Sequence, residues 1–200
     1  MNYSCYPSTE SDTSRIDWST IQEVELVDVL EGDKPRLRTA VKACWTKEEL
    51  IIRFECEDDH VVATMTEHDA PLYEEDVVEV FIDTSGSGEV YYELEISPRN
   101  VVFDAIVHNN LQGSFTADTS WHAEGMRTAV VVGEGGSWSC ELQIPFSAVG
   151  NVPAPGTVWR WNLYRIDDDQ QGERHFWAWS PTGAIQFHVP SRFGMLTFEG

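Results

Sequence analysis

Hydrophobic and polar residues alternate with a period of two along most of the chain from Val24 onward. Such alternation is typical of β-strands, in which successive side chains point to opposite faces. Short turns separate the apolar runs, and no segment carries the longer period of an amphipathic helix. We therefore expect strands over residues 36–45, 49–58, 77–83, 90–96, 101–108, 127–132, 137–144, 158–167, 175–180 and 193–199.

Many short strands joined by tight turns predict an all-β fold, an antiparallel β-sandwich with at most short helical turns, one of them over residues 145–150. The 200-residue chain is long enough to bury a hydrophobic core, and residues 18–200 contain no linker or break in composition. We expect residues 18–200 to form one domain, preceded by a polar N-terminal arm over residues 1–17.

The hairpin predicted for residues 77–96 combines apolar side chains with carboxylates. A register that pairs apolar with apolar positions sets Glu79 close to Glu93, beside Phe81 and Tyr91. Carboxylates that face each other repel, and burying them without a partner costs several kcal/mol. An arginine, a metal ion or the hydroxyls of a ligand would compensate. Alternatively, this face of the hairpin is exposed to water, as one face of an antiparallel sheet often is.

The chain has a formal net charge of −21 and contains eight tryptophans, six tyrosines and nine phenylalanines. So much negative charge repels phosphate groups, which makes nucleic acids and anionic membranes poor partners. Neutral ligands, cations and Ca²⁺ suit this charge better. Because the tryptophan N–H needs a partner when it is buried, some of the tryptophans are expected to line a surface or cleft.

The four cysteines do not form a C-x-x-C pair, which argues against a zinc ribbon or a thioredoxin-type site. Cys44, Cys56 and Cys140 lie in apolar, strand-like runs and are expected to be small core residues with free thiols. No signal peptide and no bilayer-spanning apolar run is visible. We expect a cytoplasmic protein, or a secreted one if a leader has been removed.

Four stretches of the sequence resemble the family 9 carbohydrate-binding modules, and most closely the stand-alone bacterial family 9-like proteins. They are LYEEDVVEVFID, YYELEI, VWRWNLYRID and WSPTGAIQFHVPSRFGMLTFEG. The D-x-V-E-x-F-x-D strand and the terminal F-H-x-P-x-R-F-G-x-L segment are the most specific parts, and the resemblance runs from about Trp18 to the C-terminus. It implies a DOMON-like β-sandwich, of jelly-roll or immunoglobulin-like type, that binds the end of a glucan or xylan chain between two aromatic rings without catalysis. Structural Ca²⁺ is common in that family.

The resemblance also implies a set of carbohydrate-binding residues. Tyr73 and Phe187 take the positions of the two stacking aromatics, where the family usually has tryptophan, and Glu79 matches the strand glutamate that bonds sugar hydroxyls. Ala184 replaces an asparagine that often contributes a further contact. Both aromatic replacements reduce the stacking platform. The full predicted set is Tyr73, Glu79, Glu93, Arg165, Phe187 and His188.

Arg165 enters this set because it could neutralise Glu79 or Glu93, or bond the sugar. It shares one face of its predicted strand with Trp159, Trp161 and Leu163. A structural salt bridge is an equally good interpretation.

The acidic runs suggest a metal site, with Asp58 and Asp76 as candidate Ca²⁺ ligands, although solvated acidic loops explain these runs as well. The histidines form neither H-x-H nor H-E-x-x-H, so a zinc site lacks support.

Two further functions stay open as alternatives. One is a haem-binding electron-transfer module of the DOMON-like type, with His188 and a methionine (Met65, Met126 or Met195) as axial ligands. The other is a glycoside-processing enzyme with two catalytic carboxylates.

Overall fold

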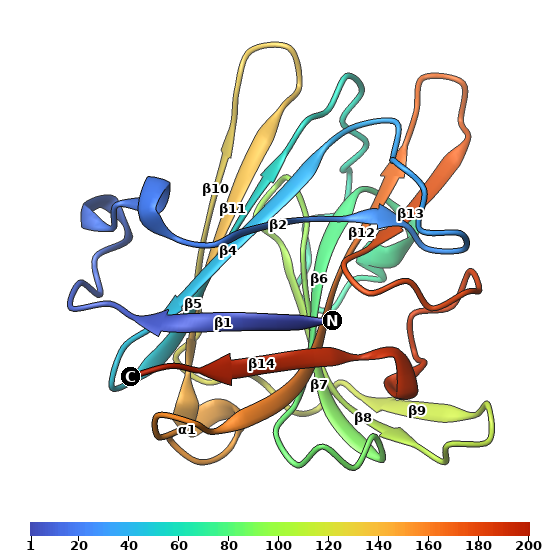
Figure 1. The fold of residues 1–200 in the computed structure, drawn as a ribbon. Coiled ribbons are helices and arrows are strands. Elements are labelled where there is room, and N and C mark those ends of the chain that lie inside the picture. Colours follow the sequence, from blue (N-terminus) through green and yellow to red (C-terminus); the bar gives the residue numbers. More distant parts are fainter.

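The period-two segments fold into strands that build two packed layers, in a computed structural model that describes residues 1–200 (Figure 1). Five short helical segments join them: the 3₁₀ turns η1 (Thr13–Arg15), η2 (Trp18–Thr20), η3 (Leu72–Glu74) and η4 (Pro190–Arg192), and the helix α1 (Phe146–Val149). The strands are β1 (Asn2–Pro7), β2 (Glu23–Glu25), β3 (Val27–Asp28), β4 (Thr39–Trp45), β5 (Glu49–Cys56), β6 (Val77–Asp83), β7 (Val90–Ile96), β8 (Val102–Asn109), β9 (Phe115–Asp118), β10 (Arg127–Val132), β11 (Trp138–Pro145), β12 (Val158–Asp168), β13 (Arg174–Ala178) and β14 (Gly194–Phe198).

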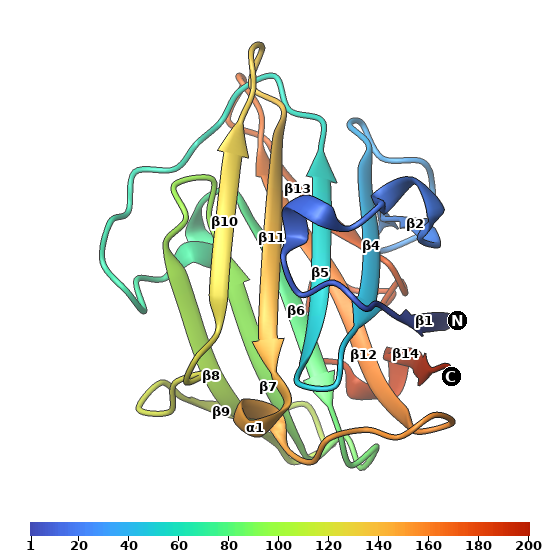
Figure 2. The ribbon, with the colours of Figure 1, turned by 90° about the vertical axis from the view of Figure 1, so that its left-hand side faces the viewer.

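The first layer has the strand order β10-β11-β5-β4, with β2 beside β4. The second layer has the order β14-β12-β6-β7-β8-β9. Next to β14, β13 pairs with the C-terminal half of β12, and β3 pairs with β13. Figure 2 shows β10, β11, β5 and β4 in front of β8, β7, β6 and β12. The neighbours within each layer are antiparallel, so the predicted antiparallel β-sandwich is confirmed.

The main hydrophobic core lies between the layers and contains 29 buried residues. Alternate residues of each strand enter it, which is why the period of two is so clear in the sequence. From β6 of the second layer these are Val78, Val80 and Ile82, and from β5 of the first layer they include Ile52 and Phe54. Cys5, Cys56 and Cys140 also belong to this core, and all four cysteines are buried and free, as expected for core thiols.

The outer face of the second layer is buried as well. A second cluster of 13 buried residues covers it, including Phe81 of β6, Tyr91 of β7 and Tyr164 of β12. Leu72 and Phe187, from the segments that precede β6 and β14, complete this cover. All seven residues of β6 are consequently buried, and the alternative that this face of the hairpin is open to water is wrong.

Residues 2–7 form a strand and not the polar arm expected for residues 1–17. β1 runs parallel to β14 through Asn2–Cys5 and parallel to β4 through Tyr6 and Pro7, so it joins the two layers along one edge. Tyr3 and Cys5 are fully buried. Six residues at a chain end contain too short an alternation to identify a strand, and its partners come from distant parts of the sequence.

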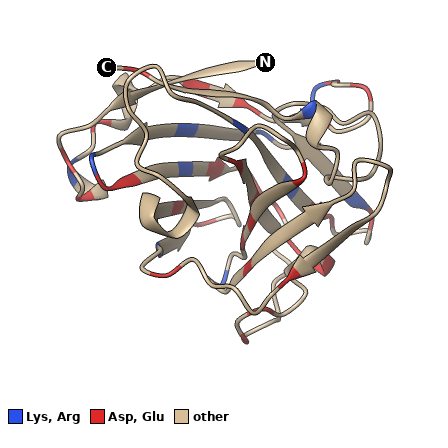
Figure 3. Cartoon of the chain, turned by 90° about the horizontal axis from the view of Figure 1, so that it is seen from below, with Lys and Arg blue, Asp and Glu red and all other residues tan.

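Acidic residues are spread over strands and loops (Figure 3). This distribution agrees with a general effect of the −21 charge on solubility. Among the helical segments, none has the length and apolar character needed to cross a bilayer.

The Tyr3 hydroxyl offers a test of how β1 holds the layers together. It accepts a hydrogen bond from the Ala43 N–H at 2.6 Å and lies 2.7 Å from the carbonyl oxygen of Gln22. Tyr3→Phe should lower the free energy of unfolding by about 1–3 kcal/mol, because a buried N–H loses its acceptor. Tyr6→Phe, at an exposed position of the same strand, should change it by less than about 0.5 kcal/mol in urea denaturation. Equal effects of the two variants would contradict this role.

Candidate ligand-binding site

A cavity of about 530 Å³ opens on the outer face of the second layer. Strands β6, β7, β8, β9, β12 and β13 contribute to it, together with η3 and the segment that leads from β13 to β14. Its lining combines three carboxylates with a majority of apolar side chains: Tyr73, Glu79, Glu93, Glu95, Phe103, Phe115, Ala117, Thr119, Ile166, Phe176, Ile185, Gln186, Phe187 and His188.

Three glutamates, which we call the glutamate triad, form the polar part of the cavity: Glu79, Glu93 and Glu95. In the β6–β7 register Glu79 pairs directly with Glu95, while Glu93 lies opposite Phe81. Carboxylate oxygens of the three approach one another within 4.8 Å, although each residue is at most 5% exposed. Both oxygens of Glu95 and one oxygen of Glu79 have no hydrogen-bond partner.

Burial raises the pKa of all three triad carboxyls well above the ordinary glutamate value, because a charged form is poorly solvated there. The charge of Glu93 raises the pKa of Glu79 further, and the charges of Glu79 and Glu93 do the same for Glu95. The pKa of Glu93 rises from 4.5 to about 8. Glu93 therefore keeps its proton at neutral pH, and the raised pKa values of Glu79 and Glu95 favour their protonated forms, so the triad offers both O–H donors and oxygen acceptors to a ligand.

Aromatic side chains form the walls of the cavity. Tyr73 is 48% exposed and meets Phe103 edge to face, with ring centroids 6.5 Å apart. Phe187 is only 8% exposed, because one face of its ring stacks on Tyr164 at 4.1 Å. Tyr73 therefore presents a free ring to the cavity, whereas Phe187 forms a firm wall whose position is set by the ring beneath it.

His188 is held in the cavity by contacts on several sides. Its Nδ1 lies 2.9 Å from the Tyr91 hydroxyl, its Nε2 lies 3.6 Å from a Glu93 oxygen, and Phe115 stacks on its ring at 3.6 Å. Burial lowers the pKa of His188 to about 4, so the ring is neutral at pH 7. Both ring nitrogens face protein groups, and the arrangement gives no support to the alternative of an axial haem ligand.

The structure brings five of the six predicted carbohydrate-binding residues to this cavity: Tyr73, Glu79, Glu93, Phe187 and His188. The predicted set did not include Glu95. This residue follows Glu93 by two positions on β7 and therefore lies on the same face of the strand. It also missed Phe115, Ile185 and Gln186, which come from segments without a clear strand pattern. None of the eight tryptophans lines this cavity, although Trp18 and Trp121 are half-buried at the surface, as expected for some of the tryptophans.

Arg165 is the sixth residue, and its assignment to the site is wrong. It pairs with Val78 in the β12–β6 register, whereas Tyr164 pairs with Glu79, so Arg165 points to the opposite face. Its fully buried guanidinium donates to Asp58 at 2.9 Å and to Asp167 at 2.5 Å. It also lies 5.0 Å from the Trp177 ring centroid. The alternative of a structural salt bridge is therefore confirmed.

Asp58 and Asp76, the candidate Ca²⁺ ligands, meet Asp167 in one buried cluster. Each of the six carboxylate oxygens already accepts a hydrogen bond. The donors are the backbone N–H groups of His60, Val62 and Asp168, the Trp138 indole, and the guanidinium groups of Arg165 and Arg36. Because Ca²⁺ requires about six to eight free oxygens and two arginines occupy this cluster, these residues do not fit a Ca²⁺ site.

Comparisons with known proteins show which family this chain is similar to. The family model described as "Carbohydrate family 9 binding domain-like" matches residues 13–200. An extracellular protein of Arthroderma benhamiae is 26% identical over 195 residues, which cover 90% of this chain and 86% of that protein. Endo-1,4-beta-xylanase A of Thermotoga neapolitana is 28% identical over 181 residues, which cover 90% of this chain but only 16% of the xylanase.

Solved structures with the same fold cover the whole chain. A Bacteroides uniformis protein with a proposed carbohydrate-binding role has a TM-score of 0.78 at 22% identity, over 98% of its length. A family 9 carbohydrate-binding module of Caldicellulosiruptor kristjanssonii in complex with cellotriose has a TM-score of 0.74 at 14% identity, over 94% of its length. Its complex with glucose has a TM-score of 0.72 at 14% identity, over 96% of that chain. At these identities the likeness shows the fold alone.

The raised pKa of Glu93 predicts how stability depends on pH. Between about pH 5 and 8 the folded protein keeps a proton that the unfolded chain releases, so the free energy of unfolding should fall as the pH rises. Glu93→Gln should flatten this fall in melting temperatures measured from pH 5 to 8. Glu89→Gln, at an exposed position of the same hairpin, should leave it unchanged. Parallel profiles for Glu93→Gln and the parent would contradict the prediction.

Proposed function

The chain belongs to the carbohydrate family 9 binding domain-like proteins, and we propose that its cavity binds a mono- or oligosaccharide, or the end of a polysaccharide chain, without transforming it. The observation that carries this proposal is the glutamate triad. Its oxygens are buried, three of the six have no hydrogen-bond partner, and they face a cavity whose remaining walls are mainly apolar. A few convergent polar groups in an apolar concavity are typical of a small-ligand site.

The two kinds of surface in the cavity match the two kinds of surface on a sugar. A pyranose has an apolar C–H face and a rim of hydroxyl groups, each of which both donates and accepts hydrogen bonds. The half-exposed ring of Tyr73 can cover the apolar face, while the triad carboxyls can bond hydroxyls of the rim. A volume of about 530 Å³ lies within the range of roughly 300–1,000 Å³ that holds such ligands.

The geometry of the triad argues for binding and against glycoside cleavage. Retaining glycosidases hold their two carboxyls about 5–5.5 Å apart and inverting enzymes about 6.5–9.5 Å, with the scissile bond between them. Here all three carboxyls come from the neighbouring strands β6 and β7 and lie on one side of the cavity, so no two of them flank the place of a bound sugar from opposite sides. The xylanase relatives match over only 16% of their length, which agrees with a module that accompanies carbohydrate catabolism.

Calorimetry with glucose, cellotriose and xylotriose tests the proposal. At least one of these sugars should bind, and Tyr73→Ala should weaken its affinity about tenfold, equivalent to about 1.4 kcal/mol, because the sugar loses its stacking surface. Tyr6→Ala, an exposed tyrosine outside the cavity, serves as the matched control and should not change the affinity. Absence of binding to all three sugars, or equal affinities for Tyr73→Ala and the parent, would refute the proposal.

Glu95→Leu should affect stability and binding in opposite directions. Replacing a buried carboxyl without partners by an apolar side chain of similar size should raise the free energy of unfolding of the sugar-free protein by about 1 kcal/mol. The same change should weaken sugar binding, because a polar contact disappears. Urea denaturation and calorimetry measure the two effects, with Glu89→Leu on the exposed end of the hairpin as control. A variant that loses both stability and affinity would instead indicate a purely structural role.

A further inference from the structure

A second group of chemically active side chains, which we call the His68 cluster, lies outside the cavity and consists of His68, Asp69, Asp104 and His122. The residues come from three segments that are far apart in the sequence: the loop between β5 and β6, strand β8, and the connection between β9 and β10. Asp104 follows Phe103 on β8, and successive strand residues point to opposite faces, so the cluster and the cavity use opposite faces of β8.

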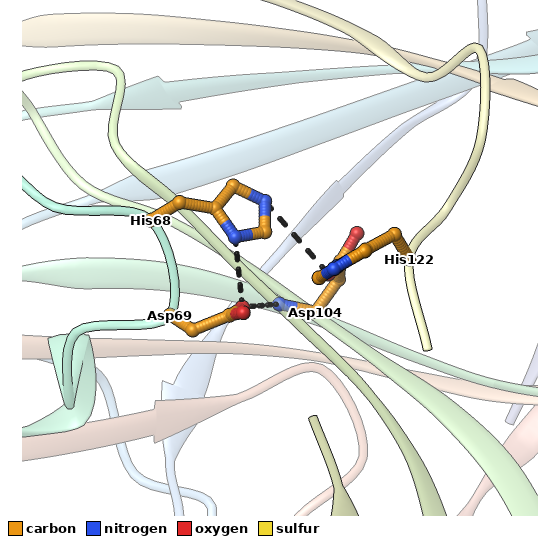
Figure 4. Close-up of side chains that lie close together, drawn as sticks. All are labelled: His68, Asp69, Asp104 and His122. Carbon is orange, nitrogen blue, oxygen red and sulfur yellow. Dashed lines mark hydrogen bonds and ion pairs between the residues drawn. The ribbon is translucent and has the colours of Figure 1, made fainter. Parts of the chain in front are cut away.

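The side chains of the His68 cluster converge on one point (Figure 4). Nδ1 of His68 lies 3.0 Å from Oδ1 of Asp69, and Nε2 of the same ring lies 3.8 Å from Oδ1 of Asp104. Nδ1 of His122 lies 3.1 Å from that same Asp104 oxygen. One ligand atom from each of the four residues fits within 4.8 Å of the others.

The protein holds the two carboxylates of the cluster in place. The Asp104 side chain is 4% exposed, and the Ala123 N–H donates to its Oδ2 at 2.7 Å, which leaves Oδ1 directed at both imidazoles. The Asp104 N–H donates to Oδ1 of Asp69 at 3.4 Å. In contrast, both histidine side chains are about half exposed and can adjust their positions.

We propose that His68, Asp69, Asp104 and His122 bind one transition-metal ion of the Zn²⁺ type. Two imidazole nitrogens and two carboxylate oxygens supply the four ligands of a tetrahedral site, and imidazole distinguishes this donor set from the all-oxygen set that Ca²⁺ prefers. Bonds of about 2.0–2.2 Å to Zn²⁺ place neighbouring ligand atoms about 3.4 Å apart. Rotation of the two exposed imidazoles toward the fixed carboxylates closes the cluster from its present spread of at most 4.8 Å.

Such an ion would join segments that also line the sugar cavity. The loop that carries His68 and Asp69 continues into η3 with Tyr73, Asp104 adjoins Phe103, and the segment of His122 begins near Thr119. Fixing these segments relative to one another should favour the arrangement that binds sugar, so metal and sugar should each strengthen the binding of the other. This consequence rests on the proposed function, whereas the metal site itself does not.

The experiment measures metal binding in the absence of sugar, on protein freed of affinity tags and treated with EDTA. Calorimetry should show one Zn²⁺ bound per chain, and Co²⁺ should give the visible absorption bands of a tetrahedral complex. Zn²⁺ should displace Co²⁺, while excess Ca²⁺ should not. His68→Ala and His122→Ala should each weaken Zn²⁺ affinity more than about tenfold, because even outer-shell partners contribute about 10- to 100-fold. Both positions are exposed loop sites, so these variants should fold.

Two further histidines serve as controls. His108→Ala removes an exposed histidine of β8, and His175→Ala removes the imidazole of a separate group with Asp169 and Glu173. Neither should change Zn²⁺ affinity. Absence of Zn²⁺ binding, binding that persists in both His68→Ala and His122→Ala, or an equal loss in His175→Ala would overturn the proposal. Sugar affinity measured with and without Zn²⁺ then tests the coupling, and sugar binding in metal-free protein keeps the proposed function separate from the metal site.

Discussion

The burial of the second layer on both of its faces is the constraint on which the candidate site depends. One face packs on the first layer, and the other is covered by the segments that precede β6 and β14. A glutamate on the outer face of β6 or β7 therefore has no route to water except through the cavity. Desolvation follows from this geometry, and it raises the pKa of the triad carboxyls and leaves their oxygens available to a ligand.

The protein treats its other buried charges differently. Arg165, which is fully buried, is compensated by Asp58 and Asp167 and lies over the rings of Trp138 and Trp177. Nearly all polar atoms of that network have a hydrogen-bond partner within the protein, so it contributes to the fold and offers no free carboxylate to a ligand. The glutamate triad has the opposite character, because three carboxyls meet there without an arginine or lysine partner and burial favours their protonated forms. Strongly perturbed carboxyls in a cavity are a physical sign of a functional site, whereas paired ones are a sign of structure.

The aromatic residues divide in a similar way. The tryptophans pack mainly into the core between the layers, where Trp159 and Trp161 contribute to a chain of edge-to-face contacts. The cavity instead uses tyrosine and phenylalanine rings, of which Tyr73, at 48%, is the most exposed. Phe187 is held by Tyr164 and His188 by Tyr91 and Phe115, so the walls exist before any ligand enters. A preformed wall lowers the entropy lost on binding.

The sequence by itself determined most of the strands, which residues share a face of each strand, and the proximity of Glu79 to Glu93, because each follows from a period-two pattern and a short hairpin. It also placed Arg165 on one face with Trp161 and Leu163. Only the tertiary structure decided that this face looks into the sandwich, because the direction of β12 depends on its pairing with β6 and not on its own alternation. Only the tertiary structure also identified β1 as a strand, because its partners lie some 40 and 190 residues away. It likewise decided that the outer face of the second layer is covered and forms a cavity. The His68 cluster has no local motif at all, because its ligands meet only when two loops and a strand pack together.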